Sequence, residues 1–199
     1  MRVLFLTNND NAKDLYNWIR EQELDIKMCE ERIDLMSVMA YAPEIIVSYN
    51  YNFLIRKDVI DYMRGNIINL HISLLPWNRG FSPNIWSFID NTPKGVTIHY
   101  IDEGLDTGDV IVQKEMIFCE EEETFATTYN RLNEEIQELF KRNWEQIKHG
   151  QIGGVHQSGE GSYHTMKDLK ELQECVPFSW DDNIGEFMKR YRGCITENK

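Results

Sequence analysis

The residues best suited to chemistry in this chain lie in two short stretches, Asn69-Leu70-His71-Ile72-Ser73-Leu74-Leu75-Pro76 and Leu105-Asp106-Thr107-Gly108-Asp109. In an extended strand, side chains two positions apart project to the same face, so Asn69 and His71 can point to one place where the strand ends. A carboxamide, an imidazole and a carboxylate together suit transfer of an acyl group to a nucleophile. The first two stabilise charge on a tetrahedral oxygen, and the carboxylate orients the ring or accepts a proton.

The elements that must position these residues alternate along the first half of the chain. Apolar runs predict short strands at 3–6, 24–28, 44–48 and 67–70. Helical spacing of apolar residues predicts helices at 12–23, 33–41 and 58–63. This alternation predicts an α/β fold, a Rossmann-like, doubly wound and mostly parallel sheet with right-handed crossovers. Ligands of such sheets lie at the carboxyl ends of the strands, which is where Asn69 and His71 fall.

The second half of the chain predicts fewer elements. We expect a helix at 84–89, strands at 96–101 and 110–113, and a long amphipathic helix from Phe125 to Ile147, capped by Thr124. After Gly153 the pattern weakens, and residues 155–199 are expected to form a hairpin and a short helix. The predicted organisation is a catalytic domain over 1–150 and a C-terminal extension over 151–199, packed on it.

Composition limits the partners and the compartment. The 21 Lys and Arg residues against 33 Asp and Glu give a net charge of -12, which disfavours binding to nucleic acid. No apolar stretch approaches the roughly 20 residues of a membrane span, and the N-terminus lacks the features of a signal peptide. The four cysteines form no CxxC pair, which favours the reduced cytoplasm. We expect a cytoplasmic protein without a nucleic-acid or membrane partner.

Over roughly residues 45 to 117 the two motifs together resemble the folate-dependent formyltransferases. The resemblance implies an enzyme with 10-formyltetrahydrofolate as co-substrate, no metal, and Asn69, His71 and Asp106 as the catalytic residues. It also implies attack of an unprotonated amine on the formyl carbon. Asn69 and His71 would stabilise the oxyanion, and Asp106, through water or His71, would help the amine lose its proton. Which residue is the formal base stays open.

The resemblance also implies a folate site, in the segment before the catalytic strand and in the loop that carries Asp106. A flat, partly apolar pterin suits a slot with apolar walls. Core packing is the alternative explanation for the apolar residues among them. The implied folate residues are Phe53, Leu54, Ile55, Ile60, Asp102, Glu103, Gly104 and Leu105.

Departures from other branches of the family favour the nucleotide-sugar N-formyltransferases. Residues 7–11 lack the glycines of the glycinamide ribonucleotide branch, and the short tail and the acidic overall charge do not suit tRNA. The chain begins at its first strand, unlike the hydrolase relatives. The segment 76–87 resembles the loop that binds the sugar nucleotide in that branch. There Arg79 would pair with the diphosphate, and aromatic or amide side chains would contact the rings and hydroxyls of the sugar nucleotide. A structural salt bridge is the alternative for Arg79. The predicted acceptor residues are Trp77, Asn78, Arg79, Phe81 and Asn84.

The predicted function is therefore transfer of a formyl group to the amine of a nucleotide-linked amino sugar, with a 4-amino-4,6-dideoxy sugar of surface polysaccharides as the expected class. The alternatives are hydrolysis of the formyl donor, formylation of another small amine, and a non-catalytic folate- or nucleotide-sugar-binding module. His99 is expected to be a structural histidine in a strand. A homodimer is a further expectation, with the C-terminal tail as its contact.

Overall fold

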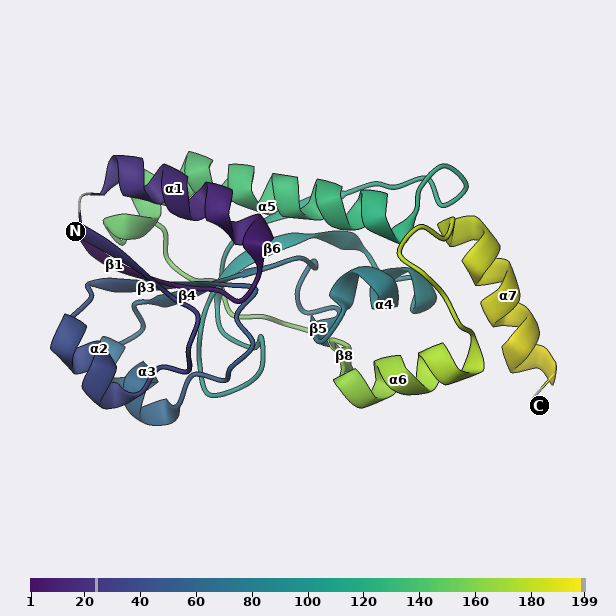
Figure 1. The fold of residues 1–199 in the computed structure, drawn as a ribbon, viewed down its shortest axis with the longest axis horizontal. Helices are drawn as coiled ribbons and strands as arrows, with labels where there is room; N and C mark the ends of the chain where they lie inside the picture. The colour runs from purple at the N-terminus through teal and green to yellow at the C-terminus, as the bar shows by residue number, and fades with distance from the viewer. Residues whose placement is uncertain (24, 198–199) are drawn as a thin grey trace. The chain divides into compact units, whose positions relative to one another are not determined.

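The computed structural model describes residues 1–23 and 25–197. Its elements, coloured along the chain in Figure 1, are β1 (Arg2–Leu6), the short 3-10 helix η1 (Asp10–Ala12), α1 (Lys13–Gln22), β2 (Asp25–Cys29), α2 (Leu35–Tyr41), β3 (Ile45–Tyr49), α3 (Lys57–Met63), β4 (Ile67–His71), β5 (Arg79–Gly80), α4 (Pro83–Ile89), β6 (Lys94–Tyr100), β7 (Val110–Met116), α5 (Phe125–Lys148), β8 (Tyr163–His164), α6 (Met166–Cys175) and α7 (Ile184–Glu197).

Six strands form one sheet in the order β2-β1-β3-β4-β6-β7. The pairs β1–β2, β1–β3 and β3–β4 are parallel, and β4 pairs antiparallel with β6. α1 lies on one face of the parallel strands, whereas α2 and α3 lie on the other (Figure 1). Covering both faces explains why β3 is buried along its whole length. The predicted α/β, doubly wound, mostly parallel sheet is confirmed.

Local signals place the ends of several elements. Asp34 accepts a hydrogen bond from the backbone N–H of Ser37 at 2.8 Å and so begins α2, as a helix cap does. Thr124 caps α5 in the predicted way, since its hydroxyl accepts from the N–H of Thr127 at 3.1 Å. The predicted start of the second strand, Leu24, lies outside the described residues.

The prediction for residues 155–199 was wrong in its elements. The segment contains no hairpin of its own among the residues described: β8 pairs in parallel with β5, so Tyr163 is opposite Arg79 and His164 opposite Gly80. Two helices, α6 and α7, follow in place of one. The end of the predicted extension, 198–199, lies outside the described residues. Pairing between segments more than 80 positions apart has no local sequence signature.

The chain divides into two compact units, and the predicted boundary at residue 150 stays a prediction. The first unit contains 1–71, 97–112 and 136–157, and the second contains 72–96, 113–135 and 158–199. In the first unit, one face of the sheet packs on the cluster around Val38, Val59 and Met63 from α2 and α3. Elsewhere in that unit Trp18 of α1 meets Phe140 of α5 edge to face.

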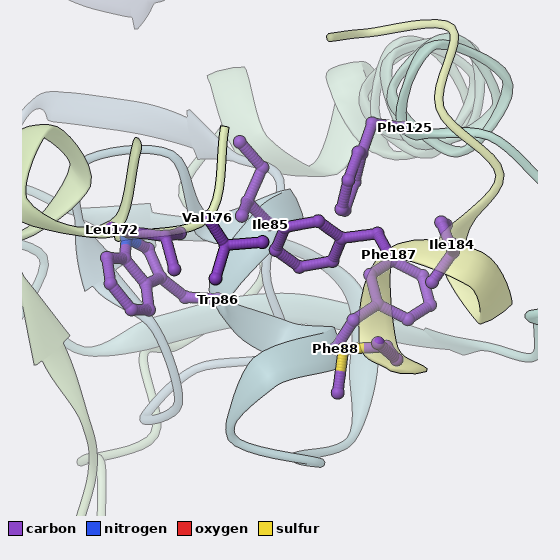
Figure 2. Packing of buried hydrophobic residues seen from close by; sticks show 9 residues of the cluster. Ile85, Trp86, Phe88, Phe125, Leu172, Val176, Ile184 and Phe187 are labelled. Carbon is purple, nitrogen blue, oxygen red and sulfur yellow. The ribbon is translucent and has the colours of Figure 1, made fainter. Parts of the chain in front are cut away.

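The core of the second unit is rich in aromatic residues (Figure 2). Phe125 packs edge to face on Phe88 and Phe187, with centroids 6.4 and 5.1 Å away. Leu172 of α6 and Ile184 of α7 complete the same cluster. Residues of four helices, α4, α5, α6 and α7, therefore meet in one apolar core. No helix in the described part of the chain is long and apolar enough to cross a membrane.

Candidate active site

Asn69 and His71 lie at the carboxyl end of β4, between two partner strands. Ile67 and Ile68 are fully buried and fix the strand, and Asn69 is paired in register with Ser48 on β3 and with His99 on β6. His71 retains 7% of its surface. The strand thus brings a carboxamide and an imidazole to one edge of the sheet, as the spacing predicts.

Asp106 faces both side chains from the loop between β6 and β7. Nδ2 of Asn69 donates to Oδ1 of Asp106 at 3.3 Å, and Nδ1 of His71 lies 3.7 Å from Oδ2. The Asp106 side chain keeps only 10% of its surface. In such a weakly hydrated place a carboxylate interacts strongly with neighbouring donors. The structure therefore brings the three predicted catalytic side chains together.

His99 lies in a strand as expected, is 1% exposed, and contacts the same cluster, a neighbourhood that the sequence did not indicate. Its Nδ1 lies 2.8 Å from the carbonyl oxygen of Tyr100, so Nδ1 carries a hydrogen. In the neutral ring Nε2 accepts a hydrogen bond, and Nδ2 of Asn69 donates to it at 3.3 Å. Nε2 also lies 3.5 Å from Oδ1 of Asp106. His99 therefore contacts both Asn69 and Asp106.

The loop that carries Asp106 is held in an unusual conformation. Asp106 has φ of 53°, a left-handed value that costs free energy in residues other than glycine and that Asp tolerates better than most. Gly108 lies against β6, and a Cβ there would stand 1.9 Å from the carbonyl oxygen of Tyr100. Gln157 donates to the carbonyl oxygens of Asp106 and Gly108 at 2.9 and 2.8 Å. Gln157 was also missed, because it lies in the segment with the weakest pattern.

The adjoining loop residues 102–105 are tied to one another and to α3. Asp102 accepts from the N–H of Gly104 at 3.0 Å and from the hydroxyl of Thr107 at 2.6 Å. Glu103 forms an ion pair with Lys57 at the start of α3. The hydrogen bond from Lys57 to Glu103, and to a lesser extent the one to Asp61, raise the pKa of the Lys57 ammonium group. The ion pair brings the two predicted folate segments side by side.

The apolar residues of those segments fall into two groups. Ile55 and Ile60 are half-buried and pack on the core cluster, so core packing accounts for part of their surface. Leu54 is 75% exposed, and Leu105 is also exposed. Phe53 is half-buried against the ring of Tyr51, with centroids 5.3 Å apart. Each of the two predicted folate segments thus exposes one leucine, and binding of a folate there stays a prediction.

The predicted acceptor residues lie in the second unit, around β5. The N–H of Arg79 donates to the carbonyl oxygen of Ser162 at 2.9 Å, and the N–H of Phe81 donates to that of His164 at 2.8 Å. Phe81 is exposed and Trp77 is half-buried. Tyr163, an exposed aromatic residue that the sequence interpretation missed, lies with its ring against Gly80.

Asn78 and Asn84 are more buried than the other predicted acceptor residues. Asn78 is 0% exposed, donates to the hydroxyl of Thr92 at 2.7 Å and accepts from the hydroxyl of Ser162 at 3.1 Å. Asn84 is 2% exposed and donates to the carbonyl oxygen of Phe125 at 3.0 Å. Both polar ends of Asn78 thus have internal partners, whereas Oδ1 of Asn84 is buried without a hydrogen-bond partner. Contact of either side chain with a sugar stays a prediction.

Among the described residues, no group of three or more His, Cys, Asp or Glu side chains is arranged to hold a metal ion. The titratable cluster of the first unit contains one carboxylate, Asp106, and two imidazoles. The rings of His71 and His99 lie 3.7 and 3.5 Å from the oxygens of Asp106, and Nδ2 of Asn69 lies 3.3 Å from both Asp106 and His99. Such a set can move protons and stabilise negative charge on oxygen.

Comparisons with known proteins agree with this geometry. Residues 6–143 match the family described as formyl transferase. The crystal structure of the formyltransferase PseJ from Anoxybacillus kamchatkensis, in complex with UDP-4,6-dideoxy-4-formamido-L-AltNAc and tetrahydrofolate, is 38% identical with a TM-score of 0.87, covering 94% of this chain and 97% of that one.

Two curated relatives differ in the share of their length that matches. A dTDP-4-amino-4,6-dideoxyglucose formyltransferase from Mycobacterium bovis is 28% identical over 204 residues, which cover 96% of this chain and 86% of that protein. A methionyl-tRNA formyltransferase from Pelotomaculum thermopropionicum is 33% identical over 153 residues, but these cover only 47% of its length. The similarity thus extends over most of the sugar enzyme and under half of the tRNA enzyme.

Proposed function

The chain belongs to the formyl transferase family, and we propose that it transfers a formyl group from 10-formyltetrahydrofolate to the amine of a nucleotide-linked amino sugar. The observation that carries the proposal is the convergence of Asn69, His71 and Asp106 within 3.3 to 3.7 Å at the edge of the sheet. Similarity over nearly the whole length to PseJ, which was solved with a formamido sugar nucleotide, supports this class of acceptor.

The side chains of the cluster divide the work of the reaction. The folate donor, when bound, supplies a formyl carbon that is open to attack by an amine. Asn69 through Nδ2 and His71 through its ring stabilise the negative charge that develops on oxygen. An ammonium group has no lone pair, so a proton must leave the acceptor, and Asp106 with His71 takes it up. Gln157 and Gly108 hold the Asp106 loop in place for this step.

The residues present in the first unit fit a folate. Leu54 and Leu105 expose apolar surface, and the ion pair of Lys57 with Glu103 brings their segments together. Residues 102–105 are themselves exposed, so their backbone groups are accessible. Apolar walls beside polar edges match a flat pterin ring with hydrogen-bonding groups on its rim.

In the second unit, Arg79 is proposed to bind the diphosphate of the acceptor, because a guanidinium pairs with phosphate oxygens through two parallel hydrogen bonds. Trp77, Phe81 and Tyr163 offer aromatic surface to the base or the sugar. We propose an acceptor whose amine is on carbon 4, by similarity to PseJ and to the dTDP-4-amino-4,6-dideoxyglucose enzyme.

The function is tested by mass spectrometry of the acceptor. The purified protein is incubated with 10-formyltetrahydrofolate and a panel of UDP- and dTDP-linked sugars that carry an amine on carbon 3 or carbon 4. We expect one 4-amino sugar nucleotide to gain the mass of a formyl group. Asn69→Ala should abolish this gain, whereas His149→Ala, at an exposed histidine of the same unit, should retain it.

Other outcomes would contradict the proposal in distinct ways. Consumption of the donor without any acceptor would identify a hydrolase. Formylation of a small amine outside the panel would assign another acceptor, and tight binding without turnover would identify a binding module.

We also propose a cytoplasmic location and a homodimer. Four cysteines without a CxxC pair support the reduced compartment. Light scattering during gel filtration tests the dimer: a monomer mass at micromolar concentration would refute it.

A further inference from the structure

Two of the four cysteines are brought into contact by the second unit. Cys175 is the last residue of α6 and Cys194 lies on α7, and their sulfur atoms are 2.8 Å apart. Cys175 is exposed and Cys194 is half-buried, so a small oxidant can reach the pair from solvent. Neither residue takes part in the proposed catalysis or in the predicted binding sites.

The other two cysteines have different surroundings. Cys29 directs its thiol to the carbonyl oxygen of Glu31 at 3.4 Å, and Cys119 directs its thiol to the carboxylate of Glu121 at 3.5 Å. All four are free thiols. The approach of Cys175 to Cys194 is therefore specific to the packing of α6 on α7.

That packing follows from the sequence of the two helices. Ile184, Phe187 and Met188 form the buried stripe of α7, and Cys194 continues it seven residues after Phe187. Leu172 of α6 enters the same core, and Val176 follows Cys175 into it (Figure 2). Since both helices are anchored beside their cysteines, the two thiols meet through the rigid core and not through a flexible tail.

We propose that Cys175 and Cys194 form a reversible disulfide that links α6 to α7. With glutathione disulfide as oxidant, one thiol loses its proton and attacks a sulfur of the oxidant, which releases one molecule of glutathione and leaves a mixed disulfide. The second thiolate attacks the protein sulfur of that mixed disulfide and releases a second glutathione. The two cysteine sulfurs are oxidised, and the oxidant is reduced to two thiols.

The bond has a physical consequence for the second unit. It closes a loop over 175–194, which carries Phe178, Ile184 and Phe187 of the aromatic core. Cross-linking this segment reduces the conformational freedom of the unfolded chain and so stabilises the fold of that unit. Reduction releases the link without changing the core contacts.

The test uses the full chain in buffers with a graded ratio of oxidised to reduced glutathione. Free thiols are alkylated after equilibration, and intact mass and peptide mapping identify each cysteine. We expect the oxidised wild type to lose two hydrogen atoms and to yield a Cys175–Cys194 cross-linked peptide. Cys119 should be alkylated or carry a single glutathione.

Matched variants separate this site from general thiol oxidation. In Cys194→Ser, the mixed disulfide on Cys175 should persist, because the resolving thiol is absent. The thermal midpoint should rise on oxidation in the wild type and in Cys119→Ser, and should not respond in Cys175→Ser or Cys194→Ser. If both cysteines stay free or carry separate glutathiones in the oxidising buffer, or if the rise survives in Cys194→Ser, the proposal is overturned.

Discussion

At the scale of single residues, the candidate site is a network in which each polar atom limits its neighbours. Nδ2 of Asn69 donates to the carboxylate of Asp106 and also faces the ring of His99, so both of its hydrogens have a partner. In the proposed mechanism, donation to a substrate oxygen replaces one of these bonds.

Replacing the carboxylate tests the central role of Asp106. Asp106→Asn keeps the shape and tolerates the left-handed backbone at this position, so the fold should survive. It removes the proton acceptor, and kcat/KM should fall by about 1000-fold. Steady-state kinetics with 10-formyltetrahydrofolate and the identified acceptor measure the loss. Asp109→Asn, at a more exposed carboxylate of the same loop, should change kcat/KM by less than about twofold. Near-normal turnover in Asp106→Asn would remove this residue from the mechanism.

Because Nε2 of His99 can accept a hydrogen bond from Asn69, two replacements of His99 should differ in their effect on kcat. His99→Leu removes the acceptor for Asn69 and should lower kcat by about 10- to 100-fold, since a buried donor loses its partner. His99→Gln keeps an acceptor and should recover part of the rate. Binding of the folate should change little in either variant. Equal rates in the two variants would show that only the volume of the ring matters.

At the scale of elements, the site depends on segments that hold a short loop from several sides. β4 supplies Asn69 and His71, β6 supplies His99, and Gln157 holds the backbone of the Asp106 loop. The hydrogen bonds of Gln157 to the carbonyl oxygens of Asp106 and Gly108 help to hold the left-handed backbone at Asp106.

Gly108 should be sensitive to substitution, because its loop lies close to β6. A Cβ in Gly108→Ala would overlap the carbonyl oxygen of Tyr100, so the backbone must shift, and the variant should lose about 2 kcal/mol or more of unfolding free energy. Gly153→Ala is the matched control, because nothing lies within 4 Å of a Cβ there, and it should stay within about 0.5 kcal/mol of the wild type. Urea unfolding measures both. Similar losses in the two variants would contradict the close approach.

Removing the bonds from Gln157 should affect activity more than stability. Gln157→Ala leaves the carbonyl groups of Asp106 and Gly108 without these donors, and kcat should fall by about tenfold as the loop becomes mobile. Gln151→Ala, at an exposed glutamine of the same unit, should keep the wild-type rate. An unchanged kcat in Gln157→Ala would mean that the loop holds its conformation without this residue.

The sequence predicted the parts of this assembly that have a local signature. Asn69 and His71 follow from the period of a strand, and Asp106 followed from the resemblance between motifs. The sequence places His99 in a strand but does not show that it lies opposite Asn69, because that neighbourhood comes from the antiparallel pairing of β6 with β4. Gln157 is 51 positions from Asp106, and β8 is more than 80 from β5. Contacts at such separations depend on the whole fold, which no window of sequence contains.

At the scale of the whole molecule, buried charge makes the stability of the protein depend on pH. Glu23, with 7% of its side chain exposed, bonds to the ammonium of Lys148 at 2.8 Å and to the α-amino group of Met1 at 3.1 Å. Burial acts to raise the pKa of this carboxyl, but the bonds to the two cations outweigh it and lower the pKa. The pair connects the end of α1 to the end of α5.

The sign of the effect follows from the lowered pKa. Glu23 is more acidic in the folded protein than in the unfolded chain, whose pKa is about 4.3. Its contribution to stability is present above that value and disappears as the pH falls through the folded pKa. Glu23→Gln should therefore cost about 2 kcal/mol at pH 7 and progressively less below about pH 4.

Urea unfolding at a series of pH values measures this difference. Glu138→Gln, at an exposed ion pair with Lys141, should remain within about 0.5 kcal/mol of the wild type throughout. A cost for Glu23→Gln that grows toward acid pH would reverse the assigned sign.

The path of the chain between its two units has an evolutionary consequence. The polypeptide passes from one unit to the other five times, and three of the passages fall inside β6, β7 and α5. Exchange of the whole second unit by recombination would therefore cut two strands and the long helix that both units share. Replacement of single loop residues leaves these three shared elements intact.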